Sequence, residues 1–273
     1  MEDYIYVDKL FGDNYRALVI CEFTHEIDIL KQLIEICDEA VDKKKTNQFR
    51  TYEGIIYEFA KSIVSYAKTS YDNLILGHFD VTSMIDRILT ENIVCMDLIL
   101  NNVEKGKELW KYYFIHSYKQ DIFNQKKQLT KKDKEKFFEL CNDLNIDKGF
   151  LKKRKNKNGK EYSYVDLNYG WTYKINKKFS FKGLCELINN NDYSIFSMAS
   201  LYSHGTSIYL KLGSNATVDR VFYLITSIYI SLYRMITMYC WDCIDDKFYE
   251  LAEEIESIIY EHINYCESIY EDE

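Results

Sequence analysis

Apolar residues recur at intervals of three and four along most of this 273-residue chain, which is the period of an amphipathic α-helix. Residues 14–42 show the pattern first, and the lysine run at 43–45 suits the negative end of that helix. The same period predicts four more helices, over residues 48–70, 73–102, 104–124 and 130–144. The helix at 73–102, which Gly77 is expected to bend or interrupt, carries an apolar stripe of Val81, Met84, Ile88, Cys95 and Leu98. Thr130, three residues before Asp133, resembles a helix cap.

The helical period fails at residue 147. Residues 147–160 hold seven Lys and Arg residues among Asn and Gly, which predicts a loop. Residues 161–175 alternate in the manner of a β-strand and are rich in Tyr, Val, Trp and Thr, with Asn168-Tyr-Gly170 as a turn signal. We therefore expect a small β-hairpin or an irregular insertion near 161–175.

Helical spacing returns after this insertion. The predicted helices are a short one from Ser180 to Asn189, one that begins at Tyr193, an apolar one at 217–243 and an acidic one at 245–270. The fold class is therefore all-α, a multi-helix bundle. We expect residues 1–273 to form a single elaborated domain, with N-terminal helices at 14–70 and the acidic helix at its C-terminal end.

Residues 221–240 are mostly apolar and as long as a membrane-spanning helix, but Arg234 lies among them. A central arginine costs about 2.5–3.5 kcal/mol on membrane-insertion scales. We therefore expect a buried helix of a soluble protein and no membrane contact. A buried arginine needs a partner, and Glu91 and Asp97 are the candidates.

The composition is that of a soluble globular protein, with 47% hydrophobic and 29% charged residues. The first residues lack a basic region followed by an apolar one, which favours a cytoplasmic location. The eight cysteines are scattered, which favours reduced thiols, and Cys240-Trp-Asp-Cys243 has no second pair to complete a zinc site. Because phosphate-binding and dinucleotide motifs are also missing from the sequence, we expect neither a metal nor a cofactor.

Charge is unevenly distributed along the chain. Residues 126–160 hold 13 Lys and Arg against 5 Asp and Glu, whereas residues 241–273 hold 1 against 12. A basic segment in a chain of net charge −8 is either a solvated surface or a contact for nucleic acid. On the second interpretation, RNA binds through residues 148–160, and Lys153 and Arg154 are candidate contacts.

The predicted helix at 193–204 has a polar face inside apolar surroundings. Tyr193, Ser197, Ser200 and His204 fall at helical offsets of three and four, and Gly205 is placed to end the helix. Ser200 and His204 are then one turn apart and within reach of each other.

Three segments in this order are similar to a bacterial domain of unknown function, family 5677. They are the Arg87-x-x-x-Glu91 helix, the Tyr169-Gly-Trp171 element and the Ser200-x-x-x-His204-Gly helix. The resemblance covers about residues 72–242. It implies a helical fold with a site that includes Arg87, Glu91, Trp171, Ser200 and His204, and it brings no established activity.

Arg87, Glu91 and His204 allow two interpretations. Arg87 and Glu91, one turn apart, can form a surface ion pair, and His204 can be a cation at a helix end. Alternatively the three residues converge with Ser200 in a catalytic site, where Arg87 holds an anion and His204 transfers a proton. Helical ribonucleases of the HEPN class are an analogy of fold only, because this chain lacks their Arg-x-x-x-x-His motif.

Two classes of function follow. One is RNA cleavage or RNA binding in prokaryotic stress or phage defence, with Trp171, Tyr193, Lys153 and Arg154 as substrate-binding residues. The other is a non-catalytic interaction protein or homodimeric scaffold, in which Arg87, Glu91 and His204 form a structural polar network. The two differ in whether those three residues open onto a cleft.

Overall fold

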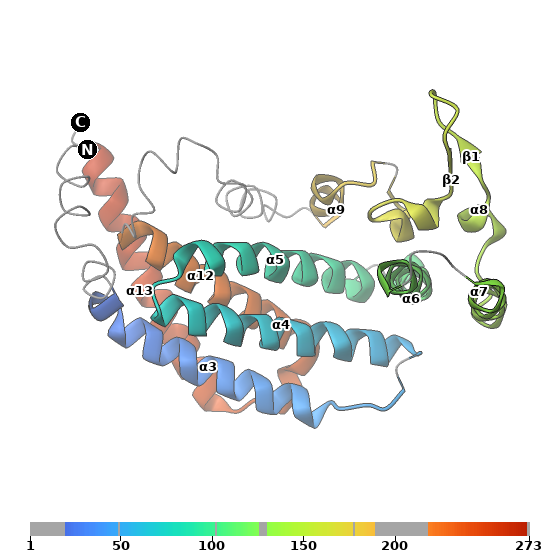
Figure 1. Cartoon of the computed structure of the whole chain (residues 1–273). Coiled ribbons are helices and arrows are strands. Elements are labelled where there is room, and N and C mark those ends of the chain that lie inside the picture. The colour runs from blue at the N-terminus through green and yellow to red at the C-terminus, as the bar shows by residue number, and fades with distance from the viewer. Residues whose placement is uncertain are drawn as a thin grey trace. The chain divides into compact units, whose positions relative to one another are not determined.

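A computed structural model describes residues 20–48, 50–101, 103–125, 130–176, 178–188 and 218–271 (Figure 1). Helices make up well over half of the chain, and the described strands form a small two-stranded antiparallel sheet. The predicted all-α class with a small insertion is therefore confirmed. The chain divides into two compact units, which are described separately.

The first unit comprises residues 1–45, 59–93 and 194–273. Its described helices are α3 (Thr24–Lys43), most of α4 (Tyr52–Ile75), the first part of α5 (Phe79–Asn101), α12 (Val218–Met235) and α13 (Asp246–Glu271). Helix α3 packs against both α12 and α13 (Figure 1). Fully buried side chains fill the space between the three helices, among them Leu33, Ile228 and Phe248. This core accounts for the helical period seen in the sequence.

The end of α12 departs from a regular helix. A π-helix, Ile236–Cys240, and a 3₁₀ turn, Trp241–Cys243, follow it before α13 begins. Lys44 donates a hydrogen bond to the Asp242 carboxylate over 2.8 Å, which ties this turn to the end of α3. Within the described residues, one stretch, Arg220–Cys243, is long and apolar enough to cross a membrane, and 61% of its most apolar window is buried within the protein, as in many core helices.

The second unit comprises residues 46–58 and 94–193. Its described elements, besides the ends of α4 and α5, are α6 (Val103–Gln125), α7 (Lys131–Asp143), α8 (Lys148–Leu151), β1 (Arg154–Lys155), β2 (Glu161–Tyr162), η1 (Tyr164–Asp166), η2 (Gly170–Thr172) and α9 (Phe181–Leu187). The Thr130 hydroxyl accepts a hydrogen bond from the Asp133 amide at the start of α7, so the predicted cap is present. Ser180 caps α9 in the same way.

The hairpin lies earlier in the chain than the sequence pattern predicts. Strands β1 and β2 pair with Arg154 opposite Tyr162 and Lys155 opposite Glu161, and their connection falls in the predicted loop (Figure 1). The Asn156 side chain holds that turn by accepting hydrogen bonds from the amides of Asn158 and Lys160, each over 2.9 Å. Residues 163–176 form 3₁₀ turns and irregular backbone, so Asn168-Tyr-Gly170 is no hairpin turn.

Trp171 is the centre of the irregular segment. Its side chain is 2% exposed and packs edge-on against Tyr113, with ring centroids 5.3 Å apart. The preceding Gly170 lies so close to the Tyr164 carbonyl that a Cβ atom would come within 1.7 Å of its oxygen. Only glycine fits there, so this position fixes how the segment packs beneath η1.

The first half of α5 buries a different face from the predicted one. Val81, Met84 and Ile88 are 43%, 50% and 40% exposed, although Cys95 and Leu98 of the same predicted stripe are buried. The buried positions in this half are largely polar: Thr82, Ser83, Asp86 and Thr90. The prediction was wrong here because these short polar side chains find hydrogen-bond partners inside the unit and can therefore be buried.

Seven cysteines have described side chains, and all seven are free thiols. Cys37, Cys95, Cys141, Cys185 and Cys240 are buried, whereas Cys21 is exposed and Cys243 is partly exposed. Burial raises the pKa of Cys141 and that of Cys240, each to about 12. These thiols behave as small apolar side chains within the two units.

Candidate functional site

A buried carboxylic acid lies between α5 and α12 in the first unit. Asp86 is 0% exposed, and its carboxylate accepts hydrogen bonds from the Ser227 hydroxyl and, over 3.4 Å, from the Tyr223 hydroxyl. Ser227 and Tyr223 are one turn apart on α12, so both side chains approach Asp86 from the same helix face. Burial raises the pKa of Asp86 to about 6, although both hydrogen bonds act in the opposite direction. Near neutral pH the unit therefore holds a buried negative charge.

A buried arginine lies on the same helix pair. Arg220 of α12 is 6% exposed, and its Nη2 atom is 2.6 Å from Asp80 Oδ1 and 3.2 Å from the Ser83 hydroxyl. The Ser83 hydroxyl in turn donates to the Phe79 carbonyl over 2.8 Å. A buried cation requires such compensation, and α5 supplies it with a carboxylate and a hydroxyl one turn apart. The α5–α12 polar contact, as it is called below, consists of six residues on these two helices: Asp80, Ser83, Asp86, Arg220, Tyr223 and Ser227.

The sequence-predicted catalytic residues lie partly outside the described part of the chain. Arg87 and Glu91 are on α5, one turn apart and partly exposed, next to the α5–α12 polar contact. Ser200, His204 and Tyr193 lie outside the described residues. The convergence of Arg87, Glu91 and His204 therefore stays a prediction.

The buried arginine of α12 lies at a different position from the predicted one. Arg234 is partly exposed, whereas Arg220, fourteen residues earlier on the same helix, is buried. The pairing of Arg234 with Glu91 or Asp97 stays a prediction. The sequence does contain a pattern that indicates a polar face on this helix. Polar residues recur within the apolar helix at intervals of three and four, at Arg220, Tyr223, Ser227 and Ser231. That spacing places polar groups on one face, and the polar residues of α5 face them.

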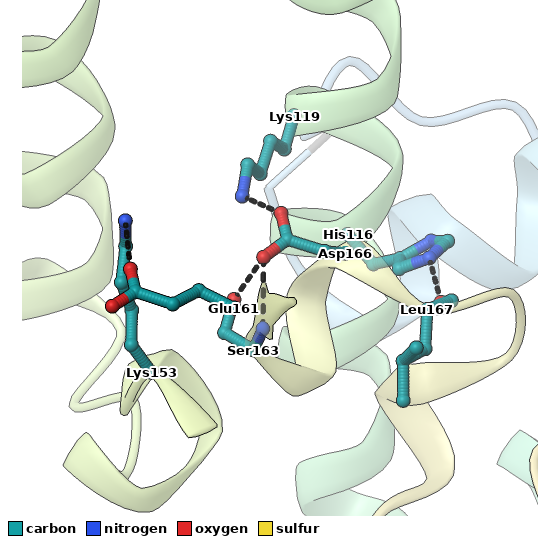
Figure 2. A network of polar contacts seen from close by, with 7 residues as sticks. All are labelled: His116, Lys119, Lys153, Glu161, Ser163, Asp166 and Leu167. Carbon is teal, nitrogen blue, oxygen red and sulfur yellow. Dashed lines mark hydrogen bonds and ion pairs between the residues drawn. The ribbon is translucent and has the colours of Figure 1, made fainter. Parts of the chain in front are cut away.

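The second unit contains a polar network between α6 and the segment that follows β2 (Figure 2). Asp166 accepts an ion-paired hydrogen bond from Lys119 of α6, and its other oxygen accepts from the Ser163 amide over 2.9 Å and from the Ser163 hydroxyl. Burial raises the pKa of Asp166, but the hydrogen bonds from Lys119 and Ser163 outweigh it and hold the pKa below its usual value. The carboxylate thus stays ionised and fixes η1 on α6.

His116 completes this network. Its Nε2 atom lies 2.9 Å from the Leu167 carbonyl oxygen, to which a neutral ring donates its single N–H (Figure 2). Burial lowers the pKa of His116, and the hydrogen bond to Leu167 offsets part of this effect. A neutral histidine committed to a backbone carbonyl is a structural support for the turn after η1.

The two strands form a narrow hairpin with many exposed cations. Residues 152–162, called the basic hairpin below, hold six Lys and Arg residues and one carboxylate, Glu161. Lys153 lies 3.4 Å from Glu161 in an exposed ion pair (Figure 2). The remaining lysines are exposed and form no ion pair within the described residues: Lys152, Lys155, Lys157 and Lys160.

Arg154 differs from these lysines because its side chain is held in place. Its Nη1 atom donates to the carbonyls of Gly149 and Lys152 over 3.1 and 3.0 Å. Its guanidinium carbon lies 4.0 Å from the centroid of the Tyr164 ring. Of the predicted substrate-binding residues, Lys153 and Arg154 are thus on one hairpin, whereas Trp171 is buried in the core of the unit.

Within the described side chains, no group of three or more His, Cys, Asp or Glu residues is arranged to hold a metal ion. Three arrangements of polar and charged side chains are described above. They are the buried α5–α12 polar contact, the network around Asp166 and the exposed basic hairpin. Of the three, the basic hairpin is exposed to solvent over most of its charged groups.

Comparison with known proteins gives the family and leaves the activity open. The profile of a family of unknown function, DUF5677, matches residues 53–217. This match includes Asp86, Arg87 and Glu91 of α5 together with the basic hairpin, and it ends before α12. No curated protein and no solved structure matches the chain. Because the match covers more than half of the 273 residues, the chain belongs to the family of unknown function DUF5677.

Proposed function

We propose that this protein binds RNA through the basic hairpin. The observation that carries the proposal is the set of exposed lysines at 152–160, for which Glu161 is the one carboxylate on the hairpin. Lysines without carboxylate partners are available to phosphates, and each phosphate contact releases condensed counterions from the nucleic acid. The proposal is therefore that hairpin lysines contact the RNA backbone.

The charge of the whole second unit supports this proposal. The second unit holds 22 Lys and Arg residues against 15 Asp and Glu, whereas the first unit holds 13 against 28. A positive unit attracts a polyanion over a distance of about 10 Å at moderate salt. The acidic first unit repels it, so RNA is expected to bind the second unit selectively.

The rigidity of the hairpin also favours binding. The connecting turn is held by the Asn156 side chain and by a hydrogen bond from the Asn156 amide to the Lys160 carbonyl over 3.0 Å. Ordering a loop on binding costs free energy, and a turn that is already ordered avoids part of that cost. The lysines on either side of the turn are thus presented to a partner in a defined arrangement.

A salt titration with matched variants tests this function. Lys155→Gln, Lys157→Gln and Lys160→Gln together should weaken binding of a single-stranded RNA and reduce the slope of log K against log salt by about 2. The control is Lys31→Gln, Lys45→Gln and Lys247→Gln, which removes the same charge from exposed lysines of the first unit. Equal losses in the two variants, or tighter binding of a DNA strand of the same length, would contradict the proposal.

The exposed apolar stripe on α5 favours a second candidate, a homodimer. Val81 and Ile88 lie three and four residues on either side of Met84, and all three are at least 40% exposed. Such a stripe can pack antiparallel against the same stripe of a second copy, because a two-fold contact is self-complementary. This stripe is one surface through which an interaction protein of this sequence can pair with a second copy.

A further inference from the structure

The basic hairpin carries one cation that is held in a fixed position against an aromatic ring. We infer that Arg154, stacked on Tyr164, is a platform for an unpaired RNA base. This inference rests on the proposed function, because the lysines of the same hairpin hold the RNA backbone beside the platform. It assigns Arg154 to the recognition of base faces and the lysines to the recognition of phosphates.

The hydrogen bonds of Arg154 separate it from the lysines. Arginine binds phosphates best with two parallel N–H groups. One terminal nitrogen of Arg154, Nη1, already donates to the carbonyls of Gly149 and Lys152. The Nε–H and Nη2–H groups keep their side-on geometry, so what sets this side chain apart is its flat face. One face of the guanidinium lies over Tyr164, the other points away from it, and the side chain is partly exposed. Guanidinium planes and aromatic rings are the groups on which proteins stack unpaired bases.

The Tyr164 ring on which Arg154 is stacked is itself packed against other aromatic rings. The Tyr164 ring lies 5.0 Å from the Tyr173 ring and 5.2 Å from the Phe179 ring, measured between centroids. Tyr173 is itself fixed by a hydrogen bond from its hydroxyl to Asp147 over 2.7 Å. Arg154 therefore rests on an aromatic cluster that is already packed, and stacking a base on it requires little further ordering of side chains.

The strand register places a second ring beside the platform. Arg154 and Tyr162 are directly opposite each other in the antiparallel pair, so their side chains leave the same face of the hairpin. Lys155 is opposite Glu161 on the other face. One face thus presents a guanidinium and a partly exposed tyrosine, and the other presents charge. A single strand can use both faces, whereas the bases of a duplex are stacked inside it and cannot reach the platform.

The test compares RNA probes that carry the same phosphates with and without bases. The probes are a short uridine oligomer and an abasic oligomer of the same length, each titrated by fluorescence anisotropy. Wild-type protein should bind the uridine oligomer about tenfold more tightly, as expected for one stacked base. Arg154→Lys keeps the charge but has no planar group, so it should bind the two oligomers about equally. Lys155→Gln, the matched control, should weaken both and preserve their ratio.

Each outcome separates this inference from the proposed function. If wild-type protein binds both oligomers equally, or Arg154→Lys keeps the preference for bases, the base platform is wrong while RNA binding stands. If wild-type protein binds neither oligomer, both proposals are overturned. The comparison of the two oligomers on wild-type protein decides the question even if Arg154→Lys does not fold.

Discussion

Replacing Asp86 by Asn should stabilise the protein at neutral pH and lose this advantage in acid. The carboxyl is fully buried between α5 and α12, where its pKa rises from 3.8 to about 6. Asn has the same shape, and its side-chain oxygen can still accept the hydrogen bond that Ser227 donates to Asp86. The substitution therefore removes the charge and the longer hydrogen bond from Tyr223, whose acceptor oxygen becomes an amide nitrogen.

The sign of the effect follows from where the proton is held. Because the folded pKa lies above the unfolded one, the folded state keeps its proton to a higher pH than the unfolded chain does. The free energy of unfolding contributed by Asp86 therefore falls as pH rises from about 4 to about 6, and it is level above that range. A pKa difference of about two corresponds to about 3 kcal/mol. Between about pH 4.5 and pH 7.5, the advantage of the Asn variant should grow by about 2 kcal/mol.

Urea unfolding followed by circular dichroism measures this difference. Both proteins are unfolded across that pH range, and equal slopes against urea are required before the free energies are compared. Asp72→Asn, which changes an exposed carboxylate on α4, is the matched control. A difference between wild type and Asp86→Asn that stays constant within about 0.5 kcal/mol, or that shrinks as pH rises, would refute a buried ionised carboxylate at this position.

Two further predictions concern a tightly packed glycine and the exposed apolar stripe of α5. Gly170→Ala should destabilise the protein by about 3 kcal/mol or more, because the new Cβ meets the Tyr164 carbonyl, whereas Gly159→Ala, in open space at φ 76°, should cost about 1 kcal/mol. Chemical denaturation measures both, and equal losses would show that the segment before Trp171 can shift. Met84→Glu should convert a dimer to a monomer in analytical ultracentrifugation, while Phe138→Glu, at an exposed apolar position outside the stripe, should not. A wild-type monomer at every concentration would exclude the α5 dimer.

Local features of this fold could be predicted from the sequence because their causes lie within a few residues. The capping box at Thr130 and Asp133 needs only a spacing of three, and the helices follow from the period of their apolar residues. The sequence pattern predicts the hairpin too late in the chain, because the alternation of apolar residues after Glu161 suggests a strand pair there. The turn of the actual hairpin depends instead on the Asn156 side chain.

The polar site could not be predicted because its partners are far apart in sequence. Ser227 lies 141 residues after Asp86, and Arg220 lies 140 residues after Asp80. A single sequence shows that both helices have polar faces, but it does not pair them. The α5 stripe was misassigned for a related reason, since Val81, Met84 and Ile88 have the spacing of a buried face whether or not a neighbour covers them.

The buried thiols have a consequence for how the two units can be followed separately in solution. Only the thiolate form attacks an alkylating reagent, so burial and raised pKa values both protect the buried thiols. These are Cys37 and Cys240 in the first unit and Cys141 in the second. Cys21, by contrast, is exposed and open to the reagent. Slow labelling of a buried thiol therefore reports the opening of the unit that contains it. Mass spectrometry of the labelled peptides would therefore measure a separate rate of native-state opening for each unit.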